Sequence, residues 1–75
     1  MINEVYVLNQ KFDSGIICTS VFTNFDTCVK SVLNEIDMHD TEHDLVKADN
    51  ELRAQMYYYD GATEYFIEDC IVIED

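Results

Sequence analysis

An apolar stripe with helical spacing runs through the first half of the chain and limits the fold more than any other feature. The stripe residues follow one another at intervals of three, one, three, one and three positions: Phe25, Cys28, Val29, Val32, Leu33 and Ile36. This spacing places them on one side of an α-helix. Thr23 and Asp26 form a start resembling a capping box, with Asp in place of Glu. The sequence therefore predicts a helix over residues 24–36 with one face to bury.

A β-hairpin is expected before this helix. Residues 3–9 (NEVYVLN) and 16–22 (IICTSVF) are rich in β-branched and aromatic side chains, which is typical of strands. The segment between them, residues 10–15, is polar and ends in Asp-Ser-Gly, a turn signal. Its length predicts a loop longer than the tight two-residue type.

A second hairpin is expected at the end of the chain. Residues 52–59 (LRAQMYYY) alternate in character, with Leu52, Ala54, Met56 and Tyr58 on one side and Arg53, Gln55, Tyr57 and Tyr59 on the other. Asp60-Gly61 is a hairpin turn signal. Residues 64–73 (EYFIEDCIVI) then predict a fourth strand, with a candidate bulge at Glu68-Asp69.

The acidic segment over residues 37–51 supports two interpretations. A short helix beginning at Thr41 is one, because Thr41 and Asp44 repeat the capping pattern and Leu45, Val46 and Ala48 would face the core. A surface loop is the other.

These elements predict a single α+β domain over residues 1–75 with the order β-β-α-β-β. An antiparallel sheet of about four strands would carry one amphipathic helix on one face. The other face would stay open and display Tyr57 and Tyr59 as a candidate interface. A chain this short buries only about 60% of the surface that its unfolded form exposes, so a partner or a second copy would add useful burial.

Charge is the abnormal feature of the composition. Sixteen Asp and Glu stand against four Lys and Arg, for a formal net charge of −12. Solubility of a small domain needs a magnitude of only about 2–8. The excess indicates a cationic partner, a bound cation or mimicry of a polyanion, although acidity that only maintains solubility is the alternative. Direct nucleic-acid binding and anionic membranes are disfavoured, because both require basic side chains.

The cysteines and the N-terminus indicate a cytoplasmic protein. Three cysteines make an odd count without a C-x-x-C pair, which favours reduced thiols over a disulfide framework. The first residues, MINEVYVLNQ, lack the pattern of a signal peptide, and no stretch has the roughly 20 apolar residues of a transmembrane helix.

The string from His39 to His43 (HDTEH) matches H-x-x-E-H, a pattern in which two histidines bind zinc and the Glu acts as a base. A metal-dependent hydrolase using His39, Glu42 and His43 is a further alternative, although so short a chain has little material for a third ligand and a cleft. A weak surface zinc or nickel site without catalysis also stays open. No EF-hand, phosphate loop or nucleophile elbow is present in the sequence. We therefore expect no enzyme, no cofactor and no catalytic or metal site.

Carboxylates spread over one face of a small rigid body can imitate the charge array of duplex DNA, which carries one negative charge per roughly 1.7 Å of axis. Such a surface would enter a basic nucleic-acid site of another protein, guided by electrostatic complementarity. The partner-binding candidates are Glu35, Asp37, Asp40, Glu42, Asp44, Asp49 and Glu51, with Asp60, Glu64, Glu68 and Asp69 from the second hairpin.

The acidity, the size and the hairpin–helix–hairpin layout resemble small phage-encoded host-takeover proteins of the anti-CRISPR and anti-restriction type, several of which mimic DNA. The segments EVYVLNQKF, TSVFTNFDTCVKSVL and FIEDCIVIE are also similar to small β-β-α-β-β domains of bacteria and their phages. The first resemblance implies an inhibitor or decoy in the host cytoplasm that binds a basic nucleic-acid-binding host protein. The alternative is a structural interaction module that homodimerises through its open sheet face.

Overall fold

The computed structural model describes residues 2–73, and the side chains from residue 3. The described elements are β1 (Ile2–Lys11), β2 (Ile17–Phe22), α1 (Phe25–His39), α2 (Leu45–Gln55), β3 (Tyr57–Tyr59) and β4 (Glu64–Ile73). No helix in residues 2–73 is long and apolar enough to cross a bilayer.

The strands form one antiparallel sheet in the order β2-β1-β4-β3. The two long central strands pair along their whole length, with Leu8 opposite Ile67. β2 pairs with the second half of β1, and β3 pairs with the start of β4. The predicted α+β class, the four-stranded antiparallel sheet and both hairpins are therefore confirmed.

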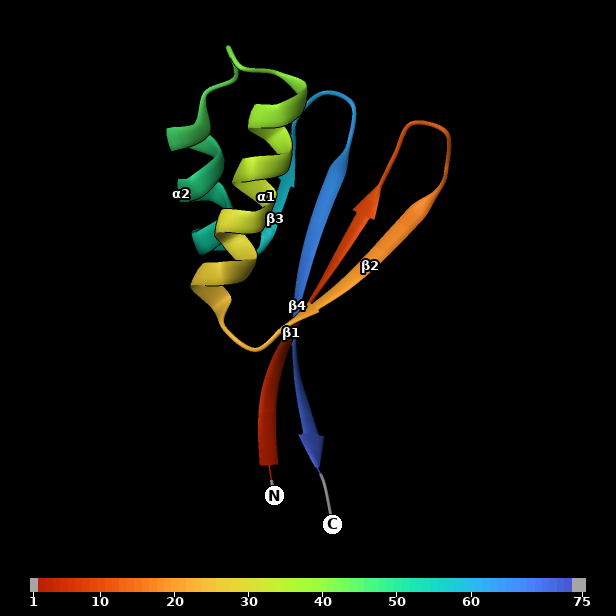
Figure 1. Ribbon diagram of the computed structural model, residues 1–75, viewed down its shortest axis with the longest axis vertical. Helices are drawn as coiled ribbons and strands as arrows, with labels where there is room; N and C mark the ends of the chain where they lie inside the picture. Colours follow the sequence, from red (N-terminus) through yellow and green to blue (C-terminus); the bar gives the residue numbers. More distant parts are fainter. Residues whose placement is uncertain (1, 74–75) are drawn as a thin grey trace.

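Both helices cover the same face of the sheet (Figure 1). The buried core between the layers consists of Leu8, Cys28, Val29, Val32, Ile36, Ala48, Leu52, Tyr58, Tyr65 and Ile67. Strand residues of one parity thus meet the stripe of α1 and a shorter stripe of α2, as the alternation of side chains across a sheet requires. The helices leave most of β2 uncovered: Ile17 to Val21 are exposed, and Phe22 packs against the core.

The predicted first helix is confirmed, but both of its ends differ from the expectation. Asn24, not Thr23, is the N-cap, and its Oδ1 accepts a hydrogen bond of 3.0 Å from the backbone N–H of Thr27. Asn is among the best capping residues. With Asn24 as the N-cap, the donor Thr27 is the third residue of the helix. α1 also continues beyond Ile36 to His39.

The prediction of a single helix was wrong, and so was the strand prediction for residues 52–55. These residues belong to α2, which begins after Asp44 rather than at Thr41. Ala48 and Leu52 lie one helical turn apart in the core, whereas Ala54 and Val46, both expected to face inward, are exposed. An eight-residue alternation is too short to separate a strand from a helix, and here the capping Asp and the core contacts decide.

The predicted bulge at Glu68-Asp69 was also wrong. The register between β1 and β4 continues without interruption through Val7 opposite Glu68 and Tyr6 opposite Asp69. Beyond this point the two strands leave the body of the molecule as a projecting two-stranded ribbon (Figure 1). The ribbon explains a Cα radius of gyration of 12.9 Å, compared with about 11 Å for a compact chain of this length.

Candidate acidic binding surface

Two turns lie at one end of the molecule, and in both of them carboxylates accept hydrogen bonds from backbone N–H groups. The turn between α1 and α2 and the turn between β3 and β4 both lie at this end (Figure 1), and His43 of the first turn bonds to Tyr58 of β3. Asp44 caps α2 by accepting a hydrogen bond of 3.0 Å from the N–H of Lys47. Asp60 accepts bonds of 2.9 and 2.7 Å from the N–H groups of Ala62 and Thr63. These carboxylates are therefore fixed in position by the backbone.

Two buried tyrosines, Tyr58 and Tyr65, lie close to acids from several elements of this end. Burial raises the pKa of Tyr65 to about 12, with further contributions from Asp60 and Glu35. Burial also raises the pKa of Tyr58, and the charges of Glu51, Asp60 and Asp44 add to the effect. Negative charges from both helices and from the strand turn therefore act on neighbouring phenols.

We call this group the acidic end. It comprises the acids at the end of α1, in the α1–α2 turn, on the side of α2 next to β3 and in the β3–β4 turn: Glu35, Asp37, Asp40, Glu42, Asp44, Glu51 and Asp60. The structure thus brings together acids that lie up to 25 positions apart in the sequence, from Glu35 to Asp60. The two helices and the turn between them carry most of these acids.

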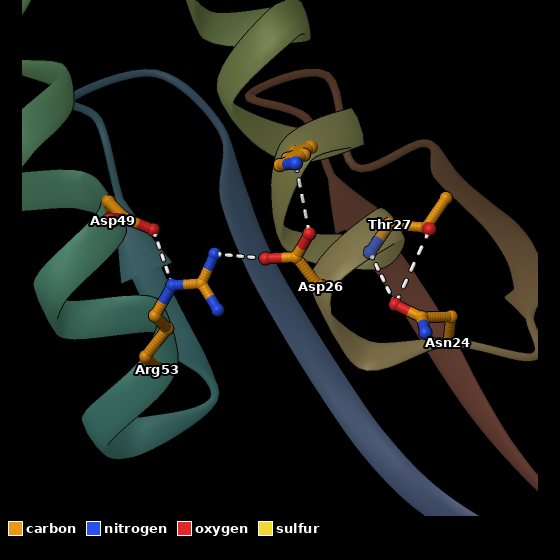
Figure 2. A network of polar contacts seen from close by, with 6 residues as sticks. Asn24, Asp26, Thr27, Asp49 and Arg53 are labelled. Atoms are coloured by element: carbon orange, nitrogen blue, oxygen red, sulfur yellow. Dashed lines mark hydrogen bonds and ion pairs between the residues drawn. The ribbon is translucent and has the colours of Figure 1, made fainter.

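Most cations of the helical layer are neutralised within the chain (Figure 2). Arg53 of α2 contacts Asp26 of α1 at 2.6 Å and Asp49 at 2.7 Å. Lys30 contacts Asp26 at 3.0 Å. Both basic partners lower the pKa of Asp26 below its ordinary value, with Arg53 the larger cause. Arg53 and Lys30 are therefore directed away from the acidic end, where Lys47 is the Lys or Arg that lies beside Glu51, whereas Asp49, expected to meet a partner, is already paired.

The remaining predicted acids do not join this group. Glu64 and Glu68 lie on the sheet face opposite the helices, since they alternate with the buried Tyr65 and Ile67. Asp69 has the opposite parity but lies where β4 leaves the body, and its side chain is exposed. The sequence placed all these acids on one surface, and the structure divides them between two faces.

The two histidines of the H-x-x-E-H string do not lie on one helix. His39 is the last residue of α1, and its Nε2 lies 3.4 Å from the carboxylate of Glu35. His43 follows the break in the helix, and its Nε2 shares a hydrogen bond with the hydroxyl of Tyr58. Within the described residues, no group of three His, Cys, Asp or Glu side chains is arranged to hold a metal ion.

The open sheet face forms a second surface. Tyr57 and Tyr59 lie there as expected, and the ring of Tyr57 packs against Phe66 at 5.0 Å between centroids. The strand at the other edge adds Ile17 and Val21, about 60% exposed. The sequence analysis did not place Ile17 and Val21 on this face. The alternation of side chains along a strand over residues 16–22 would have indicated that they share a face.

Comparisons with protein-family models, curated proteins and solved structures found no match. The function proposed below therefore rests on the residues of the chain itself.

Proposed function

We propose that this protein binds a basic surface of another protein through its acidic end and acts as an inhibitor or decoy. The favoured target is a nucleic-acid site in a host defence or DNA-processing protein. The observation that carries the proposal is the gathering of carboxylates on the helical turn and the strand turn, while Arg53 and Lys30 are neutralised by Asp26 and Asp49.

The rigidity of the acidic end supports a mimic of a polyanion. Asp44 and Asp60 are held by backbone hydrogen bonds, so ordering them on binding costs little conformational entropy. Asp37 and Glu42 are exposed between these fixed points. Fixed negative charges of this kind attract a basic groove at long range and increase the rate of association.

A binding function is also favoured over the hydrolase alternative. The only H-x-x-E-H string is interrupted by the end of α1, so His39 and His43 are not one helical turn apart on a common face. Each ring already contacts another side chain, Glu35 or Tyr58.

Affinity capture tests the proposal. The chain is immobilised, incubated with extract proteins that were first selected on heparin, and eluted with a salt gradient. We expect a nucleic-acid-binding protein that is retained at low salt, released at moderate salt and displaced by duplex DNA. A partner that survives high salt and ignores DNA would contradict the proposal.

The open sheet face favours a second candidate function, a structural interaction module. Ile17, Val21, Tyr57, Tyr59 and Phe66 lie on this face, and apolar surface of this kind marks interaction sites. Tyr59→Ser and Val21→Ser each remove an exposed apolar side chain without opening the core. Loss of a salt-resistant association in these variants would support the module, and unchanged association would exclude it.

A further inference from the structure

The outer edge of β4 has no neighbouring strand over the second half of its length. β3 pairs with β4 only as far as Phe66. From residue 69 to residue 73 the strand pairs with β1 on one side and, within the described residues, has no partner strand on the other. This part of β4 belongs to the ribbon that projects from the body (Figure 1).

The backbone groups of this edge can be assigned from one hydrogen bond. The N–H of Ile67 points away from β1, because it donates to the carbonyl of Met56 at 2.8 Å. Alternate residues of an antiparallel strand direct their N–H and C=O groups to the same side. The outward residues beyond Ile67 are therefore Asp69, Ile71 and Ile73, while Cys70 and Val72 bond toward β1.

Asp69 is the single charged residue of this edge, and the four residues that follow it carry no charge. Lys and Pro, which block exposed edges in many proteins, do not occur over residues 69–73. Ile71 is 64% exposed on one face and Val72 is 41% exposed on the other, and Ile73 is 74% exposed. Residues 70–73 are therefore apolar on both faces, and no strand among the described residues pairs with the outward N–H and C=O groups of this edge.

We propose that a second copy of the chain pairs antiparallel with this edge and joins two four-stranded sheets into one continuous sheet. The pairing is centred on Ile71, which meets Ile71 of the second copy. Cys70 then lies opposite Val72, and Asp69 lies opposite Ile73. The three outward residues are symmetric about Ile71, so an identical edge supplies a partner for each of their N–H and C=O groups.

Charge and space exclude the registers centred on Asp69 and on Cys70. Pairing of outward with outward residues requires the two-fold axis to pass through a residue rather than between two residues. Centring on Asp69 would place two like charges directly opposite each other, which is destabilising. Centring on Cys70 would place Ile73 opposite Ile67, a position that Met56 already occupies. Ile71 is the midpoint of the free stretch 69–73.

An isologous dimer closes on itself, so both β4 edges are used within the pair. Each copy carries a net charge of −12, and the two copies repel each other. Salt screens this repulsion. The dimer should therefore become tighter as salt increases, whereas binding of the acidic end to a basic partner should become weaker. The two proposals are independent, and their failures can be told apart.

Disulfide trapping tests the register. Cys18→Ser removes the other exposed thiol, and Cys28 is buried. In this background, Val72→Cys places a thiol opposite Cys70 of the second copy at a position without interchain hydrogen bonds, where Cα atoms are about 4.5 Å apart, within the disulfide range. We expect a covalent dimer under mild oxidation in the Val72→Cys variant but not in its parent. A dimer in the parent through Cys70 alone, or no dimer in either, would overturn the proposed pairing.

A proline at position 71 tests the edge itself. Ile71→Pro removes an N–H that points outward, so it removes no bond between β1 and β4. We expect sedimentation to show a dimer for the parent at high salt and a monomer for Ile71→Pro, with the same far-ultraviolet spectrum. Ile71→Val keeps the N–H and should still dimerise. A monomeric parent at high salt, or a dimeric Ile71→Pro variant, would overturn the proposal.

Discussion

Arg53 of α2 binds Asp26 of α1 at 2.6 Å between Nη2 and Oδ1, and this ion pair connects the two helices across 27 positions of sequence. Its Nε donates to Asp49 on its own helix at 2.7 Å. The two helices are therefore connected on their solvent side by charge, in addition to the apolar contacts in the core. The same contact removes Arg53 as a counterion for the acidic end.

Asp26→Asn should change how stability depends on pH. Arg53 and Lys30 lower the pKa of Asp26 below its ordinary value of 3.8, so the unfolded chain binds this proton more readily than the native state. The stabilisation is complete above the ordinary pKa and is lost as pH falls through the lowered one. The difference in free energy of unfolding between the native chain and Asp26→Asn should shrink below about pH 4. Urea titrations at several pH values measure it, with Asp13→Asn as a charge-matched control away from Arg53; a constant difference would contradict the account.

Asn24→Ala should lower the free energy of unfolding by about 1 kcal/mol, because it removes the bond to the N–H of Thr27 at the start of α1. Thr23→Ala should change it by less than about 0.5 kcal/mol. Chemical denaturation of the two variants compares them directly. A larger loss of stability in Thr23→Ala than in Asn24→Ala would indicate that Thr23 is the N-cap, as the sequence predicted.

Leu52→Ala should cost about 2–5 kcal/mol, as expected for a fully buried leucine. Ala54→Lys should change the free energy of unfolding by no more than about 0.5 kcal/mol, because Ala54 is exposed on α2. In a strand over residues 52–59 the two side chains would share a face and both changes would be costly. Denaturation of the pair therefore distinguishes the helix from the strand.

Tyr65→Phe should flatten the loss of stability at alkaline pH. Burial raises the pKa of Tyr65 to about 12 from an ordinary value of 10.0, so the unfolded chain releases the phenol proton first. The stabilisation is complete below pH 10.0 and is lost as pH rises toward about 12. Unfolding followed by circular dichroism across this range should show a weaker pH dependence in Tyr65→Phe. An unchanged pH dependence would indicate that the phenol is not protected by the core.

Long periodic segments were predictable from sequence because local pattern and tertiary contacts agree there. The stripe from Phe25 to Ile36 required a helix, and residues 64–73 form β4 with the predicted bounds. Residues 45–55 were ambiguous because their buried stripe is short and the alternation from Leu52 to Tyr58 has the period of a strand. Only the N-cap at Asp44 and the burial of Ala48 and Leu52 resolve the choice.

The acidic end was predictable in composition but not in arrangement. Sequence alone shows the excess of carboxylates, and the structure adds that Asp60 and Asp44 both act on Tyr58, while Glu64 and Glu68 lie on the other face of the sheet. The pairing of Asp49 with Arg53 was accessible from their separation of four positions once a helix is recognised. The contact of Arg53 with Asp26 depends on how the helices pack, which no local pattern encodes.

The most direct test of the central claim compares two sets of charge changes against the captured partner. One variant carries Asp37→Asn, Glu42→Gln and Glu51→Gln at the acidic end, and the other carries Asp13→Asn, Glu68→Gln and Asp69→Asn elsewhere. Each removes three negative charges, which changes the formal net charge from −12 to −9. The affinity of each is measured as a function of salt. We expect the first set to weaken binding and flatten the salt dependence, and the second to change both only slightly. Equal effects of the two sets would show that net charge alone acts, and would contradict a binding surface at the acidic end.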